Sequence, residues 1–299
     1  MARMAVKEGR RRIEDPTAGA RRSPEAVAAA AQLACVLEAS ADKPGNITPA
    51  HDFADTSYED MLRSAIAVGP ELGRAGERGV GDTVLAAVRA TGRVAGANTN
   101  LGIALLLAPL ARAALLGGTQ RERVEEVLDA LTLDDARAAY AAIRAAGAGG
   151  LDEPVEHDVR AAPTVTLRDA MATAAERDSI AAEYATGYAV TFGLGLPALA
   201  RALDAELRPR DATVELYLGL LAQIPDTLVA RKRGRRAAER VSAGAARVIA
   251  AGGVRSDAGR AAMAEFDASL RRDGNALNPG TTADLVTAVL FVALLEGHL

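Results

Sequence analysis

The segment that most constrains the fold is residues 101–116, which is apolar on almost every side and yet too short to cross a membrane. Its first part, Leu101 to Leu110, holds no charged residue, and Arg112 follows. A bilayer-spanning helix needs about 20 apolar residues. A shorter helix without a polar face must lie at the centre of a domain, covered by other helices. The C-terminal segment that ends near Leu295 has the same character, so we expect buried central apolar helices.

The rest of the chain also favours helices. Apolar residues make up 49% of the sequence, but aromatic residues only 3%, so Ala, Leu and Val must form most of the core. Ala- and Leu-rich segments with few β-branched runs favour helix over strand. No segment shows the alternation of apolar and polar residues that a half-buried strand requires. We therefore expect an all-α protein of about a dozen helices in one domain, residues 23–299.

Local signals mark the helix starts and the connections. Pro24 follows a capping Ser23, and Thr132 lies three residues before Asp135, which is the spacing of a capping box. We expect the Arg-rich residues 1–22 to be a disordered basic tail. The acidic, Pro-bearing residues 147–165 are longer than most connections. A solvated loop is expected there, and the alternative is a lid or a metal-contacting segment over a site.

Charge and cysteine content exclude some classes of protein. The net charge of −4 argues against non-specific binding of nucleic acid. The single cysteine, Cys35, excludes a disulfide within the chain, and we expect it to be a small buried hydrophobe. No apolar segment of a secretory signal follows the basic N-terminus. We expect a cytoplasmic protein that has no membrane partner.

Four polar segments rich in Gly or Pro interrupt the helices, and the first is residues 38–57. The sequence Lys43-Pro44-Gly45 cannot continue a helix, and Thr48-Pro49 keeps the chain extended. Such turn-rich surface segments often carry binding and catalytic groups. The polar side chains of interest in this segment are Glu38, Lys43, His51 and Asp52.

Two further segments, residues 92–102 and 275–285, lead directly into the apolar helices. Free backbone N–H groups and the helix dipole make such a helix start an anion site. The first of these segments contains Asn98, Thr99 and Asn100, and the second contains Gly280 and Asp284. Ordinary N-capping is the alternative for the first group. The alternative for Asp284 is a capping box with Thr281.

The fourth segment, residues 223–234, joins an acid to a basic run. Asp226 and Thr227 precede Arg231, Lys232 and Arg233. Arg and Lys hold phosphate groups by charge and by forked hydrogen bonds. The alternative is an N-cap at Asp226 followed by a solvated basic turn.

Together these segments resemble the triphosphoribosyl-dephospho-CoA synthases, which serve the citrate lyase and malonate decarboxylase systems. The resemblance covers about residues 26–296. Where the family has a His-Lys pair, this chain has Asn100-Leu101. The matching residues are Glu38, Lys43-Pro44-Gly45, His51-Asp52, Asn98, Thr99, Gly102, Asp226-Thr227, Leu277, Pro279-Gly280 and Ala283-Asp284-Leu285.

The resemblance implies a transferase that moves the triphosphoribosyl group of ATP onto dephospho-CoA and releases adenine, with Mg²⁺ accompanying the ATP. Glycosidic bond cleavage through an oxocarbenium-like state needs carboxylates, a base and cations for the triphosphate. The catalytic residues expected on the matched positions are Asp52, Glu38, His51 and Asp226. His51 would be the base, and a purely structural histidine is the alternative. The expected phosphate-binding residues are Lys43, Asn98, Thr99, Asn100, Arg231, Arg233 and Gly280. The expected metal ligands are Asp52, Asp226 and Asp284.

The replaced His-Lys pair leaves the acceptor open. One alternative is a related ribosyl or phosphoribosyl transferase that acts in another coenzyme pathway. A second alternative is a nucleotide-binding protein without turnover, against which the retained Asp52, Asp226 and Asp284 argue. The expected partners are ATP and a coenzyme-like acceptor, and the sequence does not determine the oligomeric state.

Overall fold

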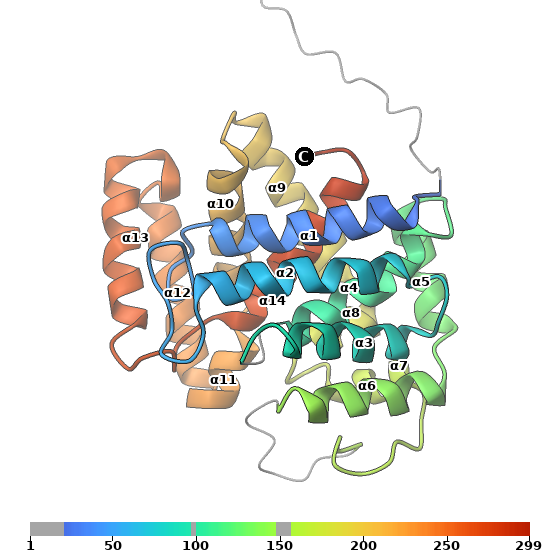
Figure 1. Ribbon diagram of the computed structural model, residues 1–299. Helices are drawn as coiled ribbons and strands as arrows, with labels where there is room; N and C mark the ends of the chain where they lie inside the picture. The colour runs from blue at the N-terminus through green and yellow to red at the C-terminus, as the bar shows by residue number, and fades with distance from the viewer. Residues whose placement is uncertain (1–20, 97–99, 148–156) are drawn as a thin grey trace, which may run out of the picture.

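The computed structural model describes residues 21–96, 100–147 and 157–299, and these residues form fourteen α-helices without a β-strand (Figure 1). The first seven are α1 (Pro24–Ser40), α2 (Tyr58–Gly73), α3 (Val80–Gly92), α4 (Leu101–Ala114), α5 (Gln120–Asp129), α6 (Leu133–Ala145) and α7 (Leu167–Ala174). The others are α8 (Ser179–Thr186), α9 (Leu196–Asp204), α10 (Pro209–Gln223), α11 (Thr227–Arg233), α12 (Arg235–Ala250), α13 (Asp257–Leu270) and α14 (Gly280–Leu295). A π-helix at Thr191–Gly195 and a 3₁₀ turn at Gly253–Arg255 complete the elements. The all-α prediction is confirmed.

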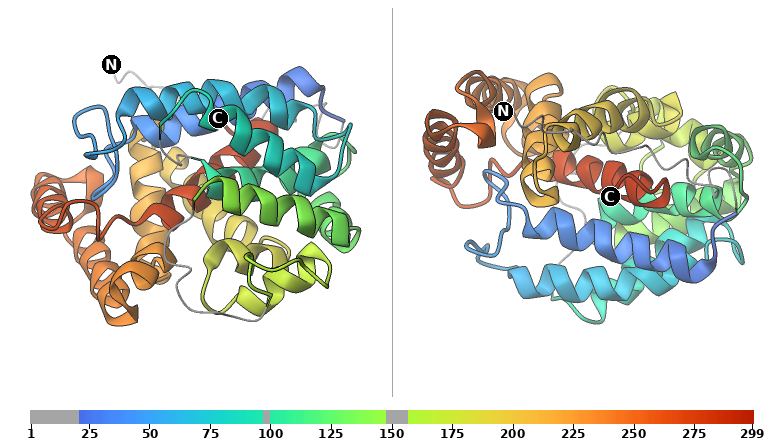
Figure 2. Two further views of the ribbon diagram at one scale, coloured as in Figure 1. Left: turned by 60° about the horizontal axis from the view of Figure 1, so that its bottom comes forward. Right: turned by 90° about the horizontal axis from the view of Figure 1, so that it is seen from above.

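The two apolar segments lie at the centre, as expected. Helix α14 packs against α1, α4 and α10, and the right view of Figure 2 shows it alongside α1. From Leu285 to Ala293 every residue of α14 is buried, as is every residue of α4 from Ile103 to Ala111. Tyr184 and Tyr188 donate hydrogen bonds to the carbonyls of Leu105 and Leu106, at 2.6 Å each. Burial without a polar face explains why neither helix could form alone in water.

Helix ends follow the local signals. Ser23 caps α1 by accepting the N–H of Ala26 at 3.2 Å. Thr132 and Asp135 form both bonds of the predicted capping box, and Asp135 Oδ1 also accepts the N–H of Gly81 at the start of α3. One acid therefore joins two helix starts, which fixes α6 against α3.

Hydrogen bonds hold the first polar segment, residues 38–57, against elements from the C-terminal third of the chain. Asp267 on α13 accepts the N–H of Gly45 at 2.7 Å, and the Tyr217 hydroxyl on α10 donates to the Pro44 carbonyl at 2.8 Å. Asn46 donates to the carbonyl of Pro279 at 3.4 Å. The C-terminal end of α1 is thereby held beside the start of α14.

Three further expectations concern single regions. Most of the predicted tail, residues 1–20, and residues 148–156 of the acidic connection lie outside the described residues. Cys35 is buried and unpaired on α1, as expected. None of the helices in the described ranges has the length and apolar character needed to span a membrane.

Candidate active site

A cavity of about 1410 Å³ opens between the ends of several helices. Its wall takes residues from all four polar segments, including Glu38, Gly102, Arg231 and Asp284. Helices α6, α7 and α8 also contribute to the wall, with Tyr140, Met171 and Ile180 among their residues. The predicted clustering of the four segments around one site is therefore what the fold produces.

Asp284 is the carboxylate at the centre of this arrangement. It lies in the first turns of α14, and within the described part of the chain its carboxylate has no hydrogen-bond or ion-pair partner. Burial and the nearby carboxylates of Glu38, Asp226 and Asp178 raise the pKa of Asp284 well above its usual range, whereas Arg231 opposes the rise. Asp284 therefore keeps its proton to a higher pH than an ordinary aspartate does. The capping-box alternative is wrong, because α14 has no side-chain cap.

Gly102 makes room for this carboxylate. A Cβ atom at position 102 would lie 2.0 Å from Oδ2 of Asp284 and 2.5 Å from its Cγ. Real Cβ atoms do not approach other atoms so closely, so the first turn of α4 accepts the carboxylate only because residue 102 has no side chain. The backbone of one central helix thus sets the position of the acid on the other.

Glu38 and Lys43 form a buried ion pair beside Asp284. Lys43 Nζ lies 3.1 Å from Oε1 of Glu38, and the two side chains are 0% and 4% exposed. The ammonium group also donates to the carbonyls of Glu38 and Ala41, at the end of α1. These three acceptors match its three N–H donors, so the predicted contact of Lys43 with a phosphate would require one of these bonds to break. Glu38 itself lines the cavity.

Removal of the lysine charge should destabilise the fold. We expect Lys43→Met to lower the free energy of unfolding by about 3–5 kcal/mol, because Glu38 would remain buried without its cation. The double variant Lys43→Met/Glu38→Gln should recover much of that loss. Denaturant unfolding of both variants measures the effect. A double variant as unstable as the single one would contradict the ion-pair explanation.

Asp226 occupies a structural position between two helices. Its Oδ1 accepts the N–H of Val229 at 2.9 Å, and its Oδ2 accepts the N–H and the hydroxyl of Thr282 at 2.7 and 2.8 Å. Burial raises the pKa of Asp226, although these hydrogen bonds act in the opposite direction. The N-cap interpretation is confirmed. Both oxygens are engaged, and Asp226 is not among the residues that line the cavity.

Two backbone N–H groups at the start of α14 also have hydrogen-bond acceptors within the protein. The N–H of Gly280 donates to the Asn278 carbonyl at 2.9 Å, and that of Thr282 donates to Asp226. Gly280 lines the cavity and packs closely on Leu228, because a Cβ there would lie 2.7 Å from Cδ2 of Leu228. Phosphate binding by the backbone at Gly280 stays a prediction, with fewer available N–H groups than the sequence indicates.

His51 and Asp52 are exposed and lie outside the cavity wall. Asp52 Oδ1 accepts the N–H of Tyr58 at 2.8 Å, which satisfies one donor at the start of α2. Asp55, three residues further on, does line the cavity, and sequence reasoning missed it. The catalytic roles of His51 and Asp52, and the metal-binding role of Asp52, remain predictions.

The second polar segment, residues 92–102, belongs only in part to the described residues. Asn98 and Thr99 lie outside the described residues. Asn100 is 2% exposed, and its Nδ2 has no hydrogen-bond partner within the described ranges. It precedes α4 without a side-chain capping bond. Capping by Asn100 is therefore wrong, and its phosphate contact stays a prediction.

Four cationic side chains border the cavity: Arg177, Arg231, Lys232 and Arg235. Arg231 Nη1 lies 3.5 Å from Oδ2 of Asp178, and Lys232 donates to the Asn275 carbonyl at 3.3 Å. Burial, and then the charge of Arg231, lower the pKa of Lys232. Arg233 is exposed and is not among the residues that line the cavity. Arg177 and Arg235 were missed, since no motif includes them.

The three expected metal ligands do not converge. No group of three or more His, Cys, Asp or Glu side chains in the described ranges is arranged to hold a metal ion. Asp52 is exposed, and both oxygens of Asp226 are engaged. Mg²⁺ typically uses one or two carboxylates together with substrate phosphates. Asp55 is an exposed carboxylate on the cavity wall that fits this lesser requirement.

Comparisons with known proteins all lead to one enzyme family. The sequence model of the family described as CitG, ATP:dephospho-CoA triphosphoribosyl transferase, matches residues 24–299. A crystal structure of an Archaeoglobus fulgidus protein, provisionally assigned as a triphosphoribosyl-dephospho-CoA synthase, superimposes with a TM-score of 0.63 and 30% identity. The match covers 79% of this chain and 99% of that one.

Curated relatives match over a shorter region. The 2-(5''-triphosphoribosyl)-3'-dephosphocoenzyme-A synthase of Klebsiella pneumoniae is 35% identical over 106 residues, which is 35% of this chain and 36% of the relative. A Pseudomonas syringae pv. tomato protein, provisionally given the same name, is 35% identical over 112 residues and 37% of each chain. The chain therefore aligns with just over a third of the length of these two relatives.

Proposed function

We propose, because the chain belongs to the ATP:dephospho-CoA triphosphoribosyl transferase family, that its cavity binds MgATP beside a coenzyme acceptor and transfers the triphosphoribosyl group to that acceptor. The observation that carries this proposal is the carboxyl group of Asp284, which has no partner among the described residues and lies in a cavity with cations at its border. Pockets for one drug-sized ligand measure about 300–1000 Å³. At about 1410 Å³, this cavity has room for two substrates.

Asp284 acts as the general acid in this proposal. Adenine is a poor leaving group until one of its ring nitrogens is protonated, and a carboxyl group with a raised pKa carries the proton it needs. As the bond between the ribose anomeric carbon and adenine breaks, the proton passes from Asp284 to adenine. The carboxylate left behind, with Glu38 nearby, then stabilises the positive charge on the sugar.

The acceptor completes the exchange. Its hydroxyl oxygen bonds to the anomeric carbon, and the hydroxyl proton passes to water once that bond has formed, because a protonated ether is strongly acidic. Asp284 takes up a proton from water before the next turnover. The triphosphate stays on the ribose throughout. Atoms and charge are thus balanced without a redox partner. Mg²⁺ enters as part of the ATP substrate, where it would neutralise phosphate charge.

Arg231 should contribute to triphosphate binding. Its guanidinium lines the cavity and is only loosely paired with Asp178, so it is available to a phosphate. We expect Arg231→Gln to raise KM for ATP about tenfold or more, since a charge-assisted hydrogen bond contributes about 1.5–3 kcal/mol. Arg233→Gln is the matched control, because this neighbour is not among the residues that line the cavity. Equal effects of the two substitutions would remove Arg231 from the site.

The acceptor is the less constrained substrate. Asn100-Leu101 replaces the His-Lys pair of the family, and Leu101 lines the cavity. This observation favours a second candidate function, in which the same donor chemistry serves another coenzyme. Mass spectrometry of acceptors incubated with MgATP distinguishes the two. Dephospho-CoA that gains a triphosphoribosyl group supports the first function, and an unmodified dephospho-CoA beside another modified coenzyme supports the second.

A further inference from the structure

A second, smaller cavity of about 330 Å³ lies between α2 and α3. Its wall, which we name the arginine pocket, consists of Glu71, Arg74, Arg78, Asp82, Leu85, Ala86, Arg89 and Arg93. It shares no lining residue with the large cavity. Four arginines therefore face two acids in one hollow of a chain whose net charge is −4.

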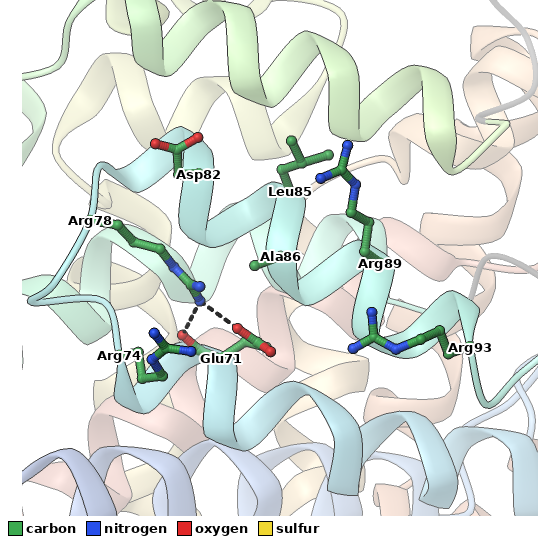
Figure 3. A pocket seen from close by; sticks show the side chains of 8 residues that line it. All are labelled: Glu71, Arg74, Arg78, Asp82, Leu85, Ala86, Arg89 and Arg93. Atoms are coloured by element: carbon green, nitrogen blue, oxygen red, sulfur yellow. Dashed lines mark hydrogen bonds and ion pairs between the residues drawn. The ribbon is translucent and has the colours of Figure 1, made fainter.

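Two of these arginines already have acidic partners. Arg78 Nη2 lies 2.7 Å from Oε2 of Glu71 and donates to the Glu71 carbonyl at 2.8 Å (Figure 3). Arg74 pairs with Glu77 at 2.8 Å. Arg112 donates to the carbonyls of Ala75 and Arg78, which fixes the connection between α2 and α3. The charges of Arg74 and Arg78 are therefore balanced by these two acids.

The other two arginines have no such partner. Arg89 lies on the last turn of α3 and Arg93 directly follows the helix, and within the described ranges their guanidinium groups make no hydrogen bond or ion pair. Figure 3 shows Arg93 directed into the pocket from the side opposite Arg74 and Arg78, whereas the Arg89 side chain runs toward Leu85. Like charges four residues apart on a helix repel each other. The helix dipole favours cations at this end of α3, but it does not account for the hollow or for the arginines across it.

We propose that the arginine pocket is a second anion site, which takes a small phosphorylated metabolite whose phosphate is bound by Arg93, with Arg89 turning toward it from the preceding turn of α3. Two guanidinium forks offer the paired N–H donors that phosphate oxygens accept. Leu85 and Ala86 provide an apolar surface for the organic part of such a molecule. The volume suits one compact ligand, at the lower end of the range for small-molecule sites.

The test must separate this pocket from the large cavity. Inorganic phosphate is titrated at constant ionic strength, with chloride as the balancing salt, and the melting temperature is followed. The parent protein carries Arg231→Gln and Lys232→Gln, so that phosphate binding in the large cavity is weakened. We expect a saturable rise in melting temperature in this parent. Adding Arg89→Gln and Arg93→Gln should weaken the apparent phosphate affinity about tenfold or more.

Two further variants make the result specific. Arg63→Gln, which removes an exposed α2 arginine paired with Asp60, is the control and should leave phosphate binding unchanged. Leu85→Glu, which introduces a carboxylate into the pocket, should abolish the effect. Phosphate that stabilises the Arg89/Arg93 variant as much as its parent would overturn the proposal. So would a parent that phosphate does not stabilise at all.

Discussion

Asp284→Asn should abolish triphosphoribosyl transfer and, at the same time, make the protein more stable above neutral pH. A positioned general acid contributes about 10²–10⁴-fold to a rate, and asparagine cannot supply its proton. The far-UV helix signal should not change, because the Asp284 carboxylate caps no helix. Loss of activity together with a gain in stability is the result expected when a group is kept in an unfavourable environment for function.

The raised pKa of Asp284 determines how the stability difference between Asp284→Asn and the wild type changes with pH. Burial and the Glu38 carboxylate raise the pKa of Asp284 in the folded protein, so the folded state retains a proton that the unfolded state has already released. The free energy of unfolding therefore falls as pH rises between the unfolded and folded pKa values, and the full penalty remains above both. Asparagine has no proton to lose. We therefore expect Asp284→Asn to be more stable than the wild type at pH 8, and to gain less stability at pH 5.

Denaturant unfolding at the two pH values, beside an activity assay, measures both halves of this prediction. Asp273→Asn is the control, because Asp273 is exposed and outside the cavity. It should change neither activity nor the pH dependence of stability. An Asp284→Asn enzyme that still transfers the sugar would remove Asp284 from the chemistry. An inactive variant whose stability gain is the same at both pH values would exclude the raised pKa as its cause.

Gly102→Ala should reduce activity about 100-fold, although it adds only a methyl group. The added Cβ would lie 2.0 Å from Oδ2 of Asp284 and 2.9 Å from Cδ1 of Ile180, so the carboxylate must move. A displacement of about 1 Å in a catalytic group can cost that much in rate. Overpacking should also cost about 1–3 kcal/mol of stability.

Gly219→Ala in α10 is the matched control, since a Cβ there would meet nothing within 4 Å. Alanine in a helix interior stabilises by about 0.5–1 kcal/mol relative to glycine. In an Asp284→Asn background, Gly102→Ala should cause little further loss of activity, because the group it displaces no longer acts. An active Gly102→Ala enzyme would show that the position of Asp284 does not limit the reaction.

The fold was largely predictable because its signals are local. The central helices α4 and α14 follow from segments that lack a polar face, and the Thr132–Asp135 capping box follows from a spacing of three residues. The resemblance carried by the four short segments correctly indicated that these segments meet. Those predictions needed no knowledge of which residues lie side by side.

The roles of single residues were harder to predict because they depend on neighbours far away in the sequence. Asp226 and Asp284 both lie near a helix start. Thr282 donates two hydrogen bonds to the carboxylate of Asp226, whereas the carboxylate of Asp284 lies against Gly102, which has no side chain that could donate one. The sequence predicts Lys43 as a phosphate ligand. Its burial against Glu38 depends on how the turn after α1 folds back onto that helix, which the sequence does not show. Asp55, Arg177 and Arg235 carry no local signal that separates them from surface charges.

The most direct test of the central claim is chromatography of free adenine after the protein has been incubated with MgATP, with and without dephospho-CoA. We predict adenine release that depends on the acceptor and disappears in Asp284→Asn. Release of ADP instead of adenine, or bound ATP that yields no adenine with any coenzyme acceptor, would contradict the proposed transfer.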